Sequence, residues 1–465
     1  MGVFAAKLIG RVRLATIQVY LRDYFAQRSI RPALMPGIRF KHIYTGAMGS
    51  VWVHLMAGVF LVYFGNRIGM TRFQWGLMGS IASLVLLGEV VSAAVTQHVG
   101  RRKLIWFVCA TLDRGLRFVG IALALLLWHH GWEIAPWVLI GSISLATCLG
   151  AMAGPPWLSW LADLIPEKEH GEFWGRRSAW VALAVIGMAV PAGLLMDHTP
   201  ESMKMRYTLL VFVAATAVGL LDLAIHGTIP EPQMTRPPRT HFFQQLMEPL
   251  KDRGFRPLLW FNFCWTFAIM IGATLLMVYL MEDLGCNKRF AGITIATTVC
   301  YLGGGVLSGR KTGQLVDRWG PKRVMFWGYL YWSLVPLSWL FLTKTNVLYI
   351  IGAVNLVAGV LLTAGMNGAI KIQTRYPPKE HRAMYIAVSN SVNYIAASLA
   401  ALCAGSLVKW LGDWSWTVRH VNFNPYDLLA VISLVLRIAA FAFLLKRLPE
   451  PPPERLEIPE ALQEE

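Results

Sequence analysis

Charged residues that interrupt apolar stretches of this chain are the first candidates for chemistry. Asp113, Arg114 and Arg117 lie in the middle of one such stretch, Lys103 to Trp128. A charge inside a membrane is costly unless it is paired or hydrated. Asp113 and Arg117 are four residues apart and can pair on one face of a helix, whereas Arg114 needs another partner. We expect Glu89 to supply it. The cluster is either a proton or anion relay or a buried ion pair that orients its helix.

Other titratable side chains lie in similar apolar surroundings. Asp222 and His226 are four residues apart, and His54 lies in an earlier apolar stretch. Histidine changes charge near neutral pH, so either His could titrate during function, or both could be packing residues. Arg437 has no acid nearby in its own stretch and must face a cavity or another helix. Binding of an anionic substrate is one role that it could have.

The motifs of common enzymes are missing from the sequence. It contains no HExxH, no G-x-S-x-G and no His or Cys cluster with metal-ligand spacing. The stretch GGVLSGRKT, residues 304–312, differs from a phosphate-binding loop by an inserted Arg and ends an apolar stretch. Five of the six Cys lie in apolar stretches and indicate no disulfide framework. We therefore expect no enzyme activity, no metal and no cofactor.

The elements that must position these residues are membrane-spanning helices. The chain of 465 residues is 55% hydrophobic and 15% charged, with a mean hydropathy of +0.49. A hydrocarbon core of about 30 Å needs roughly 20 apolar residues per helix. We predict an all-α membrane protein with twelve spans: Ile43 to Gly65, Trp75 to Gln97, Lys103 to Trp128, Pro136 to Ala162, Ser178 to Met196, Thr208 to Thr228, Pro257 to Met281, Ala291 to Gly309, Val324 to Leu342, Val347 to Lys371, Met384 to Val408 and Leu428 to Leu445.

The distribution of basic residues predicts the orientation. Of the 43 Lys and Arg residues, 30 fall on the side of the two termini, 9 on the opposite side and 4 within spans. By the positive-inside rule, both termini are cytoplasmic in a multi-pass protein of the cytoplasmic (inner) membrane. This placement explains the net charge of +17 without nucleic acid. The first 40 residues lack a signal-peptide pattern and suit an amphipathic helix in the plane of the membrane.

The chain also repeats itself at an offset of roughly 215 residues, as three echoes in the same order indicate. Val62, Tyr63, Gly69 and Gly76 recur as Val278, Tyr279, Gly285 and Gly292; residues 166–170 recur near 377–381; and Gly100-Arg101-Arg102-Lys103 recurs as Gly320-Pro321-Lys322-Arg323. Two six-helix bundles follow from this duplication. The predicted units are a basic N-terminal segment, 1–42, a first bundle, 43–228, a Pro-rich cytoplasmic linker, 229–256, a second bundle, 257–446, and a C-terminal tail, 447–465.

One loop resembles a family signature. The stretch from Gly313 to Arg323 matches G-x-L-x-D-R-x-G-[RP]-[RK]-[RK], the signature loop of bacterial and other major facilitator superfamily transporters, at every position. The matching residues are Gly313, Asp317, Arg318, Gly320, Lys322 and Arg323. The first half keeps only Gly100 and the basic run with Arg101 and Arg102, because Ala93, Gln97 and His98 replace the leading Gly, the Asp and the Arg. In the family this loop latches the two halves together.

The resemblance implies that spans one, four, seven and ten line a central cavity. Candidate cavity residues are then His54, Trp157, Ser159, Asn262, Trp265, Thr266, Asn355 and Asn367. Span eleven adds a polar run that includes Asn390 and Asn393, which either faces the cavity or packs helices together. The buried-charge candidates for coupling are Glu89, Asp113, Arg114, Arg117, Asp222 and Arg437.

The predicted function is secondary active transport of a small organic solute by alternating access, with proton coupling preferred. The alternative is a membrane assembly or sensor protein that reuses the fold without transporting, which the incomplete first-half signature favours. We expect membrane lipids and one small solute as partners, no nucleic acid, and a monomer.

Overall fold

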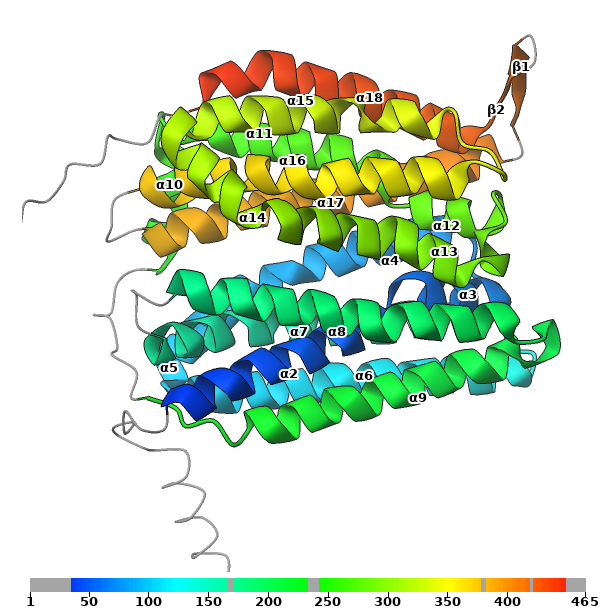
Figure 1. The fold of residues 1–465 in the computed structure, drawn as a ribbon, viewed down its shortest axis with the longest axis horizontal. Coiled ribbons are helices and arrows are strands. Elements are labelled where there is room, and N and C mark those ends of the chain that lie inside the picture. The colour runs from blue at the N-terminus through cyan, green and yellow to red at the C-terminus, as the bar shows by residue number, and fades with distance from the viewer. Residues whose placement is uncertain are drawn as a thin grey trace, which may run out of the picture.

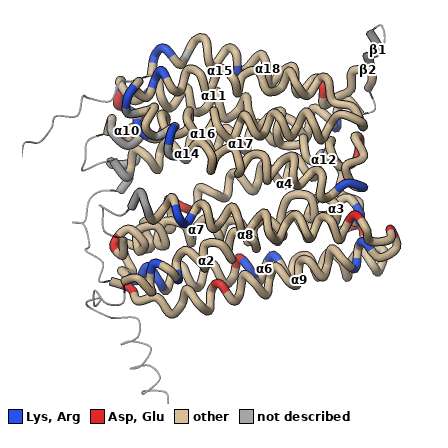
Figure 2. The backbone as a smooth tube through the Cα atoms, viewed as in Figure 1, with Lys and Arg blue, Asp and Glu red and all other residues tan. Residues whose placement is uncertain are grey.

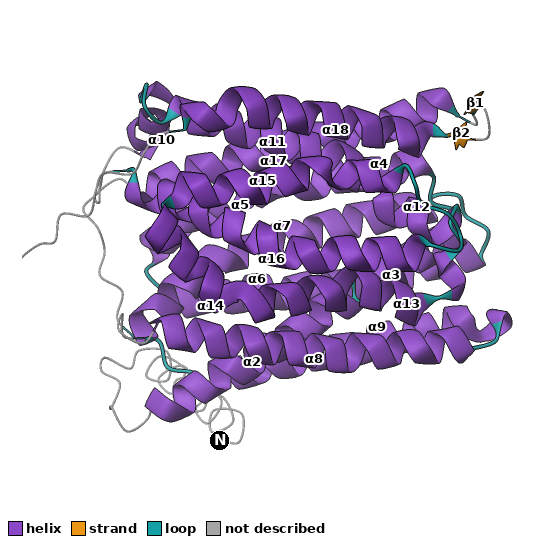
Figure 3. Cartoon of the chain, turned by 45° about the horizontal axis from the view of Figure 1, so that its top comes forward, coloured by secondary structure: helices purple, strands orange, loops and turns teal. Residues whose placement is uncertain are grey.

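The computed structural model of the protein describes residues 35–165, 170–232, 242–377, 382–412, 414–418 and 421–448. Within these ranges the chain is almost entirely helical (Figure 1). A small antiparallel ladder is formed by β1 (Trp416–Val418) and β2 (Val421–Phe423), in which Trp416 is paired with Phe423. The helices run lengthwise and the loops gather at the two ends of the molecule (Figure 3).

The first half contains six spans, two of which are broken into shorter helices. They are α2 (Met35–Leu55) with α3 (Gly58–Arg67), α4 (Arg72–Leu84) with α5 (Gly88–Val99), α6 (Arg102–His129), α7 (Ala135–Leu164), α8 (His170–His198) and α9 (Glu201–His226). A 3-10 turn, Val85–Leu87, joins α4 to α5.

The second half repeats this pattern, and its first two spans are again broken. The short helix α10 (Phe242–Lys251) precedes it. The spans are α11 (Arg256–Ala273) with α12 (Leu276–Glu282), α13 (Phe290–Thr294) with α14 (Cys300–Trp319) joined by the π-helical turn Ile295–Val299, α15 (Pro321–Trp339), α16 (Val347–Arg375), α17 (Arg382–Leu411) and α18 (Pro425–Leu444). Short 3-10 turns lie at Cys286–Lys288 and Leu445–Arg447.

The prediction of a twelve-helix membrane fold is confirmed. Ten of the described helical segments are long and apolar enough to cross a membrane. The other two spans are α6, which is 28 residues long but carries the charged cluster, and α15, which is 19 residues long and rich in Trp and Tyr. A helix satisfies its own backbone hydrogen bonds, as a segment in hydrocarbon must. The predicted unit boundaries stay a prediction, because parts of the tails and the linker lie outside the described residues.

Three predicted spans begin well after the helices do. Helix α2 begins at Met35 rather than at Ile43, α8 at His170 rather than at Ser178, and α9 at Glu201 rather than at Thr208. The predicted starts were too late because basic residues near the start of each helix were assigned to loops. Arg177 therefore lies within α8.

Glycines at equivalent positions of the two halves have positive φ angles. Gly69 and Gly285 have φ of 89° and 70°, and Gly100 and Gly320 have φ of 69° and 83°. Residues with a Cβ rarely adopt such angles. The echoes in the sequence thus correspond to positions of positive φ in both halves, which supports the duplication, although ψ is 21° at Gly100 and 153° at Gly320.

The two halves contact each other most closely at the end of the helices that lies away from the termini. The Asn66 amide donates to Glu282 at 2.7 Å, and Arg72 pairs with Asp283 at 3.0 Å. A Cβ at Gly76 of α4 would lie 2.6 Å from the Cα of Gly405 in α17. Burial raises the pKa of Asp283, and Arg72 partly offsets this rise. These contacts close this end of the molecule, and Figure 2 shows Lys and Arg gathered mainly at the two ends of the helices.

Candidate functional site

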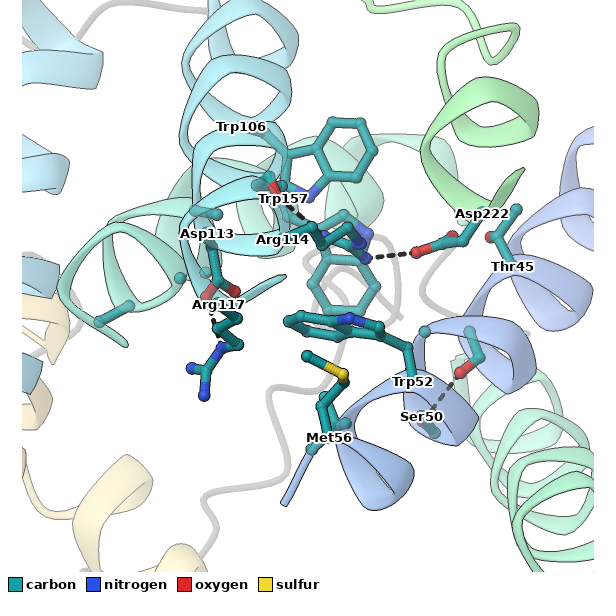
Figure 4. A pocket seen from close by; sticks show the side chains of 18 of the residues that line it. Thr45, Ser50, Trp52, Met56, Trp106, Asp113, Arg114, Arg117, Trp157 and Asp222 are labelled. Atoms are coloured by element: carbon teal, nitrogen blue, oxygen red, sulfur yellow. Dashed lines mark hydrogen bonds and ion pairs between the residues drawn. The ribbon is translucent and has the colours of Figure 1, made fainter. Parts of the chain in front are cut away.

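A cavity of about 540 Å³ lies within the first half, between α2, α6, α7, α8 and α9. Three Trp side chains, Trp52, Trp106 and Trp157, form much of its apolar wall. Its charged lining consists of Asp113, Arg114, Arg117, Arg177 and Asp222. Figure 4 shows Arg114 extending toward Asp222 while Arg117 lies beside Asp113. The predicted cluster of span three is therefore part of a cavity wall.

Four of the charged side chains of this wall form two ion pairs. Arg114 in α6 donates to Asp222 in α9 at 2.5 Å, and both side chains are buried. Arg117 donates through Nε to Asp113 at 2.7 Å, one helical turn away, as their spacing predicts. The prediction that Glu89 pairs with Arg114 is wrong. Glu89 accepts instead from the Tyr394 hydroxyl of α17 at 2.9 Å, across the two halves.

The neighbouring helices leave room for these charges. A Cβ at Gly150 of α7 would lie 2.7 Å from the Asp113 carboxylate, so the glycine lets α6 and α7 approach at this point. From α7, Thr147 accepts from Arg117 at 3.0 Å. Arg114 also lies over the Trp52 ring, 4.6 Å from its centroid. A cation over an aromatic face is stabilised, more so in a dry environment.

Arg177 is the charged residue of the site that sequence reasoning missed. Its guanidinium lies over Trp157 and Trp174, at 5.2 and 5.3 Å from the ring centroids. It also occupies the space that a Cβ at Gly46 of α2 would need, 2.6 Å from Nε. The available signal was Gly46 of α2, whose lack of a side chain leaves room for Arg177.

Histidines lie at two positions of the wall. His226 accepts from the Trp157 indole N–H at 3.2 Å, and its other ring nitrogen lies 3.8 Å from Asp222. His54 is exposed to the cavity, and its Nδ1 lies 2.8 Å from the Ser50 carbonyl oxygen. The lining thus holds three Arg and two Asp side chains, an excess of one positive charge with neutral histidines.

The polar candidates of the second half pair with one another between helices. Asn262 donates to Ser389 at 2.7 Å, and Thr266 donates to Asn393 at 2.9 Å, both between α11 and α17. Asn390 accepts from Gln373 at 3.3 Å. These side chains lie outside the first-half cavity, and their role in binding a solute stays a prediction.

The remaining second-half candidates contact side chains or backbone within the second half. Asn367 donates to Thr312 at 3.4 Å, and Asn355 donates to a carbonyl of its own helix, that of Ile351, at 2.9 Å. Trp265 is buried and stacked on Phe261, with ring centroids 5.7 Å apart. Each of these contacts is one that helix packing alone would produce.

Arg437 is 1% exposed and faces neighbouring helices. Of the two predicted surroundings, a cavity or another helix, the structure shows the second. It donates to the backbone carbonyl oxygens of Trp332 at 2.8 Å and Ile269 at 3.5 Å. The Trp332 and Trp339 rings lie at 5.7 and 5.6 Å from it. Within the described residues, no carboxylate forms an ion pair with it.

The first-half signature loop is held within its own half. Arg102 pairs with Asp163 at 2.6 Å and donates to Ser159 at 3.1 Å, which places Ser159 outside the cavity. The Arg102 backbone N–H donates to Glu231 at 2.7 Å. Burial raises the pKa of Glu231, and this hydrogen bond partly offsets the rise. Asp163 and Glu231 thus supply the acids that the loop lacks at Gln97.

The second-half loop forms the turn that its glycine predicts. Gly320, with φ of 83°, separates α14 from α15, while Arg318 and Arg323 are exposed. Gly100 ends α5 and Arg101 is exposed. The surroundings of Gly313 and the side chain of Asp317 are not among the described parts of the chain. In the described part of the chain, no group of three or more His, Cys, Asp or Glu side chains is placed to hold a metal ion.

Solved structures of transporters share this fold. The inward-open xylose transporter XylE from E. coli superposes with a TM-score of 0.65 at 14% identity, over 92% of this chain and 99% of that chain. The nucleoside transporter NupG superposes with a TM-score of 0.62 at 12% identity, over 89% and 98%. At these identities the likeness shows the fold alone.

Two curated proteins match in part. A probable chloroplastic anion transporter 3 of Arabidopsis thaliana is 27% identical over 170 residues, and the probable galactarate/D-glucarate transporter GudP of Escherichia coli K12 is 29% identical over 126 residues. The chain covers 31% and 27% of their lengths, and 32% and 26% of this chain is aligned. The family model of the Major Facilitator Superfamily matches residues 43–313 and 312–463. With twelve spans in two halves and a model match over nearly the whole chain, this protein belongs to the Major Facilitator Superfamily of membrane transporters.

Proposed function

We propose that this protein is a secondary active transporter that moves a small organic anion across the cytoplasmic membrane. The observation that carries the proposal is the cavity of about 540 Å³ in which Arg114, Arg117 and Arg177 outnumber Asp113 and Asp222. Its volume suits a small metabolite. The guanidinium group of an arginine matches the planar shape of a carboxylate. The names of the two curated relatives, an anion transporter and a galactarate/D-glucarate transporter, support the same class of substrate.

Alternating access follows from the relation between the two halves. Two parallel repeats that rock about a site between or beside them expose it to each side in turn. The contacts at Asn66, Arg72 and Gly76 close one end, and a carrier must break them in each cycle. The excess of basic residues on the side of the termini supports cytoplasmic termini and contact with anionic lipid headgroups. A proton gradient is the proposed driving force.

Binding to the purified protein tests the substrate class. We expect D-glucarate and related sugar acids to raise the melting temperature, and their neutral counterparts such as D-glucitol to leave it unchanged. Arg117→Gln should abolish the shift, since the carboxylate loses one guanidinium. Arg67→Gln is the matched control, because Arg67 is an exposed arginine that lies outside the cavity. A panel in which neutral solutes bind and anions do not would contradict the proposal.

Reconstitution tests transport itself. Proteoliposomes should accumulate labelled anion when a proton gradient is imposed, and accumulation should stop when an ionophore removes the gradient. A cysteine at Val53, which lines the cavity, should react with reagents from both sides of the membrane in a carrier. In a sensor or assembly protein the same cysteine would show one fixed pattern and no flux would be found.

A further inference from the structure

The arginines of the cavity wall differ in whether the protein supplies an acid for them. Arg114 forms an ion pair with Asp222, and Arg117 forms an ion pair with Asp113. The described lining holds no third acid for Arg177, whose buried Nε atom has no hydrogen-bond partner there. Asp222 attracts Arg177 only from beyond ion-pair distance. Three arginines and two aspartates thus leave one unbalanced positive charge in the wall, at Arg177.

Aromatic rings and a glycine fix the position of the Arg177 guanidinium. Its Cζ atom lies 5.2 Å from the ring centroid of Trp157 in α7 and 5.3 Å from that of Trp174 in its own helix, α8. A Cβ at Gly46 of α2 would lie 2.6 Å from Nε. Aromatic faces attract a cation, but they carry no net charge that could neutralise it. The guanidinium is therefore held in the cavity wall with its charge unbalanced.

The neighbouring charges limit what can bind beside Arg177. Gly46 and Gly49 are three residues apart on one face of α2. Gly46 meets Arg177, whereas a Cβ at Gly49 would lie 3.1 Å from Oδ2 of Asp222 and 3.8 Å from Nη2 of Arg114. An anion at Arg177 thus lies about one helical turn along α2 from the Arg114–Asp222 pair. A second negative charge in this space would face Asp222 and would find no unpaired guanidinium in the described lining.

The charge count of the lining predicts the charge of the ligand. A charge inside the membrane is costly unless it is paired or hydrated. A carboxylate suits a guanidinium group, because its two oxygens accept two parallel N–H bonds. One carboxylate would bring the net charge of the lining to zero, whereas two would leave it one unit negative. The arrangement therefore favours a ligand with a single negative charge.

The rest of the wall suits a carbon chain that carries hydroxyl groups. His54 is exposed to the cavity, and its Nδ1 lies 2.8 Å from the Ser50 carbonyl oxygen. A carbonyl oxygen can only accept, so Nδ1 of a neutral His54 carries the hydrogen and Nε2 is an acceptor for a hydroxyl group. The rings of Trp52 and Trp106 provide apolar surface for the carbon chain.

We propose that Arg177 binds the carboxylate of the substrate and that the cavity selects hydroxy acids with one negative charge. This inference rests on the proposed anion transport and narrows its substrate class. D-Gluconate is the probe, since it differs from D-glucarate only by a hydroxymethyl group in place of one carboxylate. Anion transport alone requires only that sugar acids bind, whereas this inference requires that D-gluconate binds more tightly than D-glucarate.

The first experiment measures the Kd of each acid by calorimetry on the purified protein at about pH 8, where ordinary histidines are neutral. D-Gluconate should bind at least about tenfold more tightly than D-glucarate. Arg177→Gln should raise the Kd for D-gluconate about 10- to 100-fold, because a charge-assisted pair is lost. Arg176→Gln is the matched control and should keep the wild-type Kd, since Arg176 is the exposed neighbour on α8 and lies outside the lining.

A second variant alters the charge count in the opposite direction. Asp113→Asn leaves Arg117 without its acid, so the lining gains a second unbalanced positive charge. The ratio of the two Kd values should shift toward D-glucarate by at least about tenfold. A ratio equal to that of the wild type would show that the charge of the lining does not select the ligand.

The substrate-free protein tests whether Arg177 serves binding or folding. Removing a buried charge that has no paired acid is often neutral or stabilising. Arg177→Gln should therefore keep or raise the melting temperature, and a fall as large as that of Arg114→Met would overturn the assignment. Arg177→Lys keeps the charge without the planar fork, and its Kd for D-gluconate should lie between those of the wild type and Arg177→Gln.

The outcomes separate this inference from the proposal on which it rests. If both acids bind but D-glucarate binds at least as tightly as D-gluconate, the selection of a single charge is refuted and anion transport survives. The same holds for the Arg177 assignment if Arg177→Gln keeps the wild-type Kd. If neither acid binds to the wild-type protein, the anion proposal fails and this inference fails with it.

Discussion

The two halves of this transporter share their fold but differ in the kind of polar side chains that they bury. The first half gathers five charged side chains and His226 around one cavity. The second half uses uncharged pairs between helices, such as Asn262 with Ser389 and Thr266 with Asn393. It also contains the buried Arg437, which binds backbone carbonyl oxygens. Duplication therefore supplies equivalent helices without equivalent chemistry. We expect the first half to bind the charged solute and the second half to move against it.

The largest expected effect comes from breaking a charge pair in the first half. Arg114→Met leaves Asp222 buried without its guanidinium, which costs about 3–5 kcal/mol. The melting temperature and the yield of monodisperse protein should fall strongly. The double variant Arg114→Met/Asp222→Asn should recover much of the loss because the buried charge is gone. Equal stability of the single variant and the wild type would contradict the pairing.

The second-largest effect is expected at the contact between the two halves, where Gly76 meets Gly405. Gly76→Ala places a Cβ 2.6 Å from the Cα of Gly405, and overpacking of this kind costs about 1–3 kcal/mol. The closed state of this end should become about 5- to 150-fold less populated. Cysteine labelling from the outer side measures this shift. Gly187→Ala is the control, since a Cβ at Gly187 meets no atom within 4 Å. Unchanged labelling in Gly76→Ala would show that the contact is not broken in the cycle.

Loss of an uncharged hydrogen-bonded pair in the second half should lower stability less than these two changes do. Asn393→Ala removes the acceptor of the Thr266 hydroxyl, and hydrogen bonds between membrane helices average about 0.6 kcal/mol. Thermal unfolding should detect a small decrease. Asn355→Ala is the matched control because Asn355 bonds only within its own helix in the described structure. A loss as large as that of Arg114→Met would mean that this half, too, depends on a buried charge network.

Arg437→Met should have the smallest net effect on stability. It gives the most direct comparison between a buried arginine of the second half and Arg114 of the first half. The substitution removes an arginine that has no carboxylate partner among the described residues, and apolar replacement of a buried ion is often neutral or stabilising. The melting temperature should stay close to that of the wild type, in contrast to Arg114→Met. A loss of anion uptake with unchanged stability would assign Arg437 to the solute pathway instead.

Local patterns in the sequence predict much of this protein. The apolar stretches predict the spans, the (i, i+4) spacing predicts the Asp113–Arg117 pair, and the glycines at 100 and 320 predict turns. Errors arise where a basic residue near a helix start is read as a loop residue. Arg177 is the example. The free-energy cost of its charge in the membrane is offset by contacts with the rings of Trp157 and Trp174. Trp174 is close to Arg177 in the sequence, but Trp157 belongs to another helix, so the sequence around Arg177 indicates only one of the two contacts.

The sequence by itself determined the membrane fold, the duplication and the family, since hydropathy, spacing and the loop from Gly313 to Arg323 are properties of short segments. Only the tertiary structure decided which partners the buried charges take. Arg114 pairs with Asp222, 108 residues away, rather than with Glu89, which binds Tyr394 at a separation of 305 residues. Such choices depend on how helices rotate and approach one another. The glycines and tryptophans between the helices determine that approach, so the cavity appears only when all five helices are assembled.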